Sequence, residues 1–190
     1  MIDVNNYPIL KSAVCELRDT SKTTHKGIAY MSQSTLKVVH FDEVKNQFVK
    51  DWDLKKDEDD GPASNDALYV CTVEDKMFFI EFKSGENQTK TLSQARRKIY
   101  DSLLILTEII EKGISKIRKN LNYILVHGDS MATLDNIIGG KAKEKSKLEQ
   151  VLDQLQKEFE GLYFKEVHIV SKDEFDIGFV KKWELQAQSQ

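Results

Sequence analysis

The chain of 190 residues is 40% hydrophobic and 31% charged, which suits one globular domain with a core of its own. Its formal net charge of −3 excludes a global positive field, so any binding of nucleic acid must use local basic patches. The start lacks a basic and an apolar leader region, and no apolar run approaches the roughly 20 residues of a membrane span. We therefore expect a cytoplasmic protein that does not engage a membrane.

The first third of the chain is predicted to alternate helices and strands. Apolar residues recur at helical spacing at Leu10, Val14 and Leu17, and strand-forming residues precede His40. The predicted elements are a helix over 9–18, a polar turn over 19–26, a strand over 36–40, an amphipathic helix over 41–52 and a charged loop over 55–65. That loop leads directly into Asp66.

The next segment predicts a β-hairpin, because two apolar runs are joined by a few charged residues. The runs are residues 65–73 and 77–85. Strand side chains alternate in direction, so the second run has one wholly apolar face and one face that ends in Glu81 and Lys83. Asp66 opens the partner strand, and it shares the face of Glu81 if the loop holds an even number of residues. We expect a loop of four, over 74–77.

After the hairpin, helices and strands alternate again. The apolar stripe over 91–112, closed by Gly113, predicts a long helix. The remaining predicted elements are a strand over 121–127, a helix over 142–160, a strand over 163–170 and a disordered tail over 186–190, with no element assigned to 171–185. Together these elements predict a mixed α/β sheet flanked by helices, in a single domain over 1–185.

The hairpin and its surroundings resemble the PD-(D/E)XK nuclease superfamily, the restriction-endonuclease-like fold, over roughly residues 36–126. The core of that superfamily carries an Asp on its second strand and an E-x-K motif on its third. Asp66 matches the Asp, and Glu81 and Lys83 match the E-x-K motif. The chain departs from the motif before Asp66, where Asn65 stands in place of the proline.

The resemblance implies that Asp66, Glu81 and the backbone carbonyl of Phe82 bind Mg²⁺ or Mn²⁺ through oxygen ligands. It implies that Lys83 stays protonated beside the acids and orients the attacking water or stabilises developing negative charge. The resemblance also implies accessory residues, for which the candidates are Glu43 on the preceding helix and Gln94, Arg96, Lys98 and Tyr100 on the following one.

The predicted function is therefore a divalent-metal-dependent nuclease that hydrolyses DNA, or else RNA. Basic patches would hold the substrate, and the candidates are Lys83, Lys90, Arg96, Arg97 and Lys98, then Lys112, Lys116, Arg118 and Lys119. A third group, Lys141, Lys143, Lys145 and Lys147, alternates with Ala, Glu and Ser at the start of a helix, which favours a solvated helix face. The structural alternative for the acid–lysine trio is an exposed cross-strand ion pair, worth at most about 1 kcal/mol.

Two further hypotheses remain open. The near-neutral charge and Asn65 favour a noncatalytic nucleic-acid- or protein-binding module of a defence or mobile-element system. The strand end at His127 favours a small-molecule-binding α/β domain. Each hypothesis is compatible with a homodimer or a partner protein. The four histidines lack zinc-ligand spacing, so a zinc site is not expected.

Overall fold

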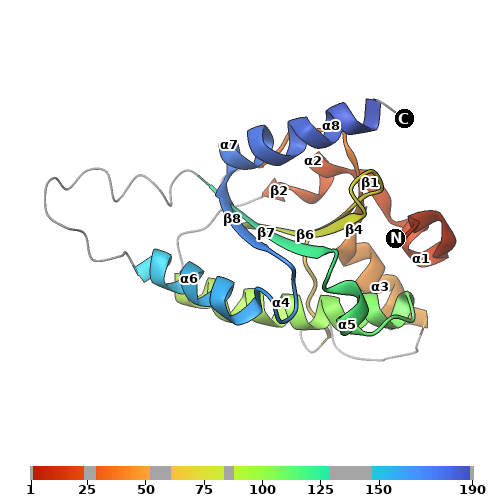
Figure 1. Ribbon diagram of the computed structural model, residues 1–190, viewed down its shortest axis with the longest axis horizontal. Helices are drawn as coiled ribbons and strands as arrows, with labels where there is room; N and C mark the ends of the chain where they lie inside the picture. Colours follow the sequence, from red (N-terminus) through yellow and green to blue (C-terminus); the bar gives the residue numbers. More distant parts are fainter. Residues whose placement is uncertain (1, 24–28, 52–60, 84–87, 129–146, 189–190) are drawn as a thin grey trace, which may run out of the picture.

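The computed structural model describes residues 2–23, 29–51, 61–83, 88–128 and 147–188. Its centre is a six-stranded sheet in the order β1-β4-β5-β6-β7-β8 (Figure 1). The strands are β1 (Val14–Glu16), β4 (Lys37–His40), β5 (Ala67–Cys71), β6 (Lys76–Lys83), β7 (Leu121–His127) and β8 (Val167–Ser171). The first four pair antiparallel, whereas β6, β7 and β8 are parallel. The predicted mixed sheet is confirmed.

Helices cover both faces of this sheet (Figure 1). One face carries α1 (Pro8–Ser12), α3 (Phe41–Asp51), α4 (Gln88–Ile109), α5 (Ile114–Ile117) and α6 (Lys147–Phe159). The other carries α2 (Leu17–Thr20), α7 (Lys172–Phe175), the π-helical turn η3 (Asp176–Val180) and α8 (Lys181–Gln188). Among the described helices, none has the length and apolar composition needed to cross a membrane.

Two separate cores follow from the alternation of side chains along the strands. On β6, Met77 and Phe79 are buried under the α4 layer, whereas Phe78 and Ile80 are buried under the α8 layer. Smaller elements lie near the N-terminus, namely η1 (Val4–Asn6) and a two-stranded sheet of β2 (Lys22–Thr23) and β3 (Ala29–Tyr30). Glu81 continues the Met77 and Phe79 face and therefore points toward α4.

The predicted hairpin is formed by β5 and β6, with a loop over residues 72–75. The loop has the expected length of four residues but begins two positions earlier than the expected 74–77. Asp75 closes it with a left-handed φ of 50°. Ala67 pairs with Ile80, so Asp66, one residue before β5, lies in register opposite Glu81. The loop therefore holds an even number of residues, as a shared face for Asp66 and Glu81 requires.

The helix expected over 9–18 is wrong. α1 ends at Ser12, and the next residues form β1, where Val14 pairs with Val39 and Cys15 with Val38. Helical spacing of apolar residues is local information, whereas this strand forms because its backbone hydrogen-bonds to a distant one.

The C-terminal region differs from the prediction as well. α7, η3 and α8 occupy the stretch from 172 to 185 that was left unassigned, and they bury Phe175, Val180 and Trp183 against the sheet. α8 continues to Gln188, so most of the expected tail is helical. Elements predicted near their observed positions are β4, α3, α4, β7, α6 and β8. Residues 52 and 142–146 of the predicted helices, and residues 55–60 of the predicted loop, lie outside the described residues.

Candidate functional site

Two acids meet on the α4 side of the sheet, near the end of β6. The Glu81 side chain is fully buried, and that of Asp66 is 17% exposed. The backbone N–H of Phe82 donates to Asp66 Oδ2 at 2.6 Å, which fixes Asp66 against β6. Both carboxylates contact one nitrogen of Lys98, at 3.1 and 2.8 Å, so they lie within about two strand rises of each other. The predicted juxtaposition of Asp66 and Glu81 is therefore present.

Two lysines surround these acids. Lys98 Nζ lies 3.1 Å from Asp66 Oδ1 and 2.8 and 2.9 Å from the two carboxylate oxygens of Glu81. Lys83 Nζ lies 2.8 Å from Glu81 Oε1. Asp66, Glu81, Lys83 and Lys98 form what we call the acid–lysine cluster. Its two negative and two positive side chains balance, and they carry between 0 and 23% exposure.

Lys98 reaches the cluster because it lies on the buried face of α4. Ala95 stands three residues before it and Ser102 four residues after it, and both are buried. Residues at these spacings share one helix face. The flanking pattern used for the sequence prediction placed Lys98 beside the apolar stripe as an accessory residue. Its position within the Ala95–Ser102 row is the sequence signal that indicates a more central place, and the flanking pattern did not use it.

Side chains of α4 also hold the backbone that precedes Asp66. Ser102 Oγ accepts a hydrogen bond from Asn65 N–H at 2.8 Å, and Asp101 accepts one from Ala63 N–H at 2.8 Å. Arg97 donates to the Gly61 carbonyl at 2.7 Å. The entry into β5 is therefore registered against the helix that carries Lys98.

Asp42 of α3 makes a further contact with this entry segment, since the Ser64 hydroxyl donates to its carboxylate. Glu43, the acid expected to assist from α3, is exposed. The residue of α3 that turns toward the site is thus Asp42, one position earlier, and it acts through Ser64 on the position of Asp66.

Burial and the neighbouring charges both shift the pKa values in the cluster. Burial and the neighbouring Glu81 raise the pKa of Asp66 to about 7, although Lys98 and the Phe82 N–H act in the opposite direction. Burial by itself would lower the pKa of Lys98, but Glu81 and Asp66 outweigh it and raise that pKa. Lys98 is therefore a permanent cation in this setting.

Tyr123 on β7 adds an unusual polar group beside the acids. Its side chain is fully buried, and burial, followed by Glu81 and Asp66, raises the pKa of its hydroxyl well above the ordinary value. Among the described residues that hydroxyl has no hydrogen-bond partner. An orphaned buried hydroxyl normally indicates a missing polar neighbour, such as an ordered water.

The donor set fits a hard divalent cation in type but is small. Within the described segments, no group of three or more His, Cys, Asp and Glu side chains gathers for metal binding. A third protein oxygen must come from the backbone. Lys83 directs its carbonyl toward β7, where Gly128 N–H donates to it at 3.1 Å. Because successive residues of a strand face opposite neighbours, the N–H and carbonyl of Phe82 face the β5 side, where the N–H donates to Asp66. Two carboxylates, this carbonyl and water form a set suited to Mg²⁺ or Mn²⁺.

Two of the expected accessory residues serve another contact. Arg96 donates to Glu158 of α6 through Nε at 2.8 Å and contacts it through Nη2 at 2.6 Å. The Tyr100 hydroxyl donates to the same carboxylate at 3.3 Å, and its ring packs on Phe159. Both residues therefore join α4 to α6. Gln94 is exposed, four residues before Lys98 on the same row of the helix.

His127 lies next to the cluster in the sheet, because it pairs in register with Lys83 on the parallel strand β7. Its Nδ1 lies 3.3 Å from the Gly128 carbonyl oxygen. Of the expected basic patches, Lys112 and Lys116 line a pocket of about 160 Å³ near the hairpin loop, at the other end of β6. Lys141, Lys143 and Lys145 lie outside the described residues.

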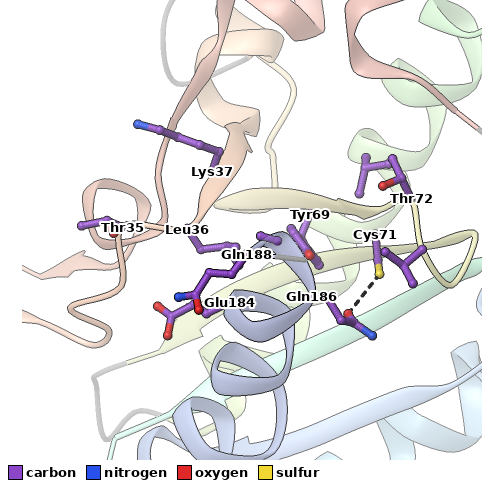
Figure 2. Close-up of a pocket in the computed structure, with 12 residues that line it drawn as sticks. Thr35, Leu36, Lys37, Tyr69, Cys71, Thr72, Glu184, Gln186 and Gln188 are labelled. Atoms are coloured by element: carbon purple, nitrogen blue, oxygen red, sulfur yellow. Dashed lines mark hydrogen bonds between the residues drawn. The ribbon is translucent and has the colours of Figure 1, made fainter. Parts of the chain in front are cut away.

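A larger pocket, of about 660 Å³, is formed by β4, β5 and α8 at the loop end of β5 (Figure 2). Cys71 donates to Gln186 across it at 3.4 Å, and Tyr69 and Glu184 also line it (Figure 2). Glu184 is the sole acid among the described residues that line this pocket. The pocket therefore lacks a pair of carboxylates like the one that Asp66 and Glu81 form at the opposite end of β5.

No protein-family model matches the chain, and comparisons with curated proteins and with solved structures give no match. An assignment of function therefore depends on the acid–lysine cluster.

Proposed function

We propose that the chain has a restriction-endonuclease-like fold and acts as a divalent-metal-dependent nuclease on DNA or RNA. The observation that carries the proposal is the convergence of Asp66, Glu81 and Lys83 from two strands onto one face of the sheet. If these charges formed only an exposed cross-strand ion pair, their side chains would lie in solvent. Here Glu81 is fully buried and Lys83 is 18% exposed, which is costly unless the charges serve one another or a ligand.

In this proposal Asp66, Glu81 and the Phe82 carbonyl hold Mg²⁺ or Mn²⁺. The bound cation would neutralise the charge that develops on the phosphodiester in the transition state. Asp66 is positioned by the Phe82 N–H, and Lys83 is positioned by Glu81 Oε1. Lys83 would donate to a nonbridging phosphate oxygen or orient the attacking water. His127 on β7 pairs in register with Lys83, so it would lie beside Lys83 where the substrate binds.

Cleavage of single-stranded and duplex DNA and RNA, with Mg²⁺, Mn²⁺ or EDTA, tests this proposal. We expect metal-dependent cleavage by the wild type and its loss in Glu81→Gln, a change that keeps the size of the side chain, replaces one acceptor oxygen by an amide donor and removes one ligand charge. Glu108→Gln is the matched control, because it makes the same change at an exposed position of α4, ten residues after Lys98. Cleavage that survives Glu81→Gln would contradict the proposal.

A noncatalytic binding module is the second candidate, and the balanced charges of the cluster favour it. Lys98 and Lys83 neutralise both acids without any added cation. A site of this kind could persist as a structural ion-pair network on a domain that binds nucleic acid or protein. If the wild type neither binds Mn²⁺ nor cleaves, but still retains labelled nucleic acid in a gel-shift assay, this candidate replaces the nuclease.

A further inference from the structure

We infer that Lys98 is an internal counter-cation that occupies the metal position of the cluster, and that Mg²⁺ or Mn²⁺ binds by exchange with its ammonium group. Lys98 would thereby set the metal affinity of the site. This inference rests on the proposed function, because it concerns the same two acids, but it makes a separate statement about binding that does not require turnover.

The contacts distinguish Lys98 from Lys83. Lys98 Nζ bridges the two carboxylates, with contacts to Asp66 Oδ1 and to both oxygens of Glu81 between 2.8 and 3.1 Å. Lys83 Nζ contacts Glu81 Oε1 at 2.8 Å, at the outer end of the strand. A cation shared by Asp66 and Glu81 must enter the space between their oxygens. That space is where the Lys98 ammonium lies.

The electrostatic balance of the cluster supports an exchange over a simple addition. With both lysines in place the four side chains carry no net negative charge, so the pair of acids offers little net attraction to a further cation. Withdrawal of Lys98 leaves two buried carboxylates against one lysine, which is unfavourable alone. A divalent cation compensates for the withdrawal because it brings more charge than the ammonium it replaces.

The side chain of Lys98 has the freedom that an exchange requires. It is 23% exposed, so its ammonium is not sealed in the core. A lysine carries its charge on a flexible four-carbon stem that can keep its apolar part packed while the head moves into water. Gln94 is exposed one turn earlier on the same row of α4, so a polar side chain borders Lys98 on that side.

Isothermal titration of the full chain with Mn²⁺, supported by thermal melts in EDTA and in Mn²⁺, tests this inference. We expect Lys98→Met to bind Mn²⁺ about tenfold or more tightly than the wild type. We also expect this variant to melt lower than the wild type in EDTA and to gain more from Mn²⁺. Lys157→Met removes one positive charge from an exposed position of α6, outside the acid–lysine cluster, and should leave the Mn²⁺ affinity unchanged.

An Mn²⁺ affinity in Lys98→Met that equals or falls below that of the wild type would overturn the inference, and cleavage by the wild type would then leave the nuclease proposal standing. Absence of Mn²⁺ binding in both proteins would overturn both proposals together. If Lys98→Met folds only when Mn²⁺ is present, the inference is supported. If it folds under neither condition, Lys98→Gln, which keeps a hydrogen-bond donor without the charge, is subject to the same affinity criterion.

Discussion

The backbone N–H of Phe82, on β6, donates a 2.6 Å hydrogen bond to the carboxylate of Asp66, the residue that precedes β5. This bond fixes the first acid to the residue that follows the second acid, Glu81. The hairpin itself therefore contributes to the spacing of the two carboxylates, in addition to the contacts from α3 and α4. Asp66 therefore has two roles that a mutation can separate. It accepts a hydrogen bond from β6, and it carries a negative charge when ionised.

Asp66→Asn separates these roles, because an amide oxygen can still accept from the Phe82 N–H but carries no charge. We expect this variant to fold with near wild-type stability and to lose Mn²⁺ binding and cleavage. Asp66→Ala removes the acceptor as well and should cost about 1–3 kcal/mol of unfolding free energy, the usual penalty for an unsatisfied buried donor. Urea unfolding and isothermal titration measure the two effects. Wild-type cleavage by Asp66→Asn would remove Asp66 from the site.

Lys83→Ala should separate metal binding from turnover. Lys83 contacts Glu81 Oε1 and does not bridge the acids, so its loss should change the Mn²⁺ affinity less than the loss of Lys98 does. If Lys83 stabilises developing charge on the phosphate, its removal should lower kcat by about 10²-fold. Single-turnover cleavage at saturating Mn²⁺ measures the rate. A rate equal to that of the wild type would show that Lys83 is a structural partner of Glu81 alone.

Arg96 and Glu158 should contribute to stability and leave the chemistry intact, because their ion pair joins α4 to α6 away from the acids. Both side chains are about one third exposed, at 32% and 30%, so solvent weakens the interaction. A double-mutant cycle of Arg96→Ala and Glu158→Ala should give a coupling of about 0.5 kcal/mol. The cleavage rate per folded molecule should be unchanged. A selective loss of cleavage in Arg96→Ala would return Arg96 to the substrate-binding residues.

Glu74, in the hairpin loop, should confer a pH-dependent stability. Hydrogen bonds from Lys182, Lys76 and Gln186 lower its pKa from 4.5 to about 2, so the folded chain favours the ionised form. A depressed carboxyl pKa adds stability above the unfolded value, and this stability is lost as the pH falls from about 4.5 to 2. Glu74→Gln should therefore cost about 1 kcal/mol at pH 7 and nothing near pH 2.

Denaturant unfolding of the wild type and Glu74→Gln at several pH values measures this difference. The same contacts bind the hairpin loop to α8, since Lys182 Nζ lies 2.5 Å from Glu74 Oε1 and Gln186 donates to that oxygen at 2.7 Å. A stability difference that stays constant between pH 7 and pH 2 would contradict an ionic origin of the contact.

The sequence predicted the parts of the site that depend on local alternation. The pattern from Met77 to Lys83 determined which residues face α4, and an even loop was sufficient to bring Asp66 opposite Glu81. Lys98 was named only as an accessory residue. Its central role depends on the angle at which α4 packs on the sheet, and single-residue charge patterns do not contain that information.

Non-local pairing and irregular helices explain the remaining differences. Val14 and Cys15 carry a spacing that suits a helix, yet their backbone pairs with Val39 and Val38 of β4. In the C-terminal region the π-helical turn η3 interrupts the regular period between Phe175 and Trp183, so the apolar residues there do not follow one stripe of an ideal helix.

The division of the cluster between one hairpin and the next helix has a consequence for the order of folding. A hairpin forms in about 1–10 μs, and when it forms alone it brings Asp66 and Glu81 together as two like charges with no bridging cation. Docking of α4 then supplies the Lys98 ammonium and relieves the repulsion. We expect the β5–β6 hairpin and α4 to gain stability as one kinetic unit, in which neither persists without the other.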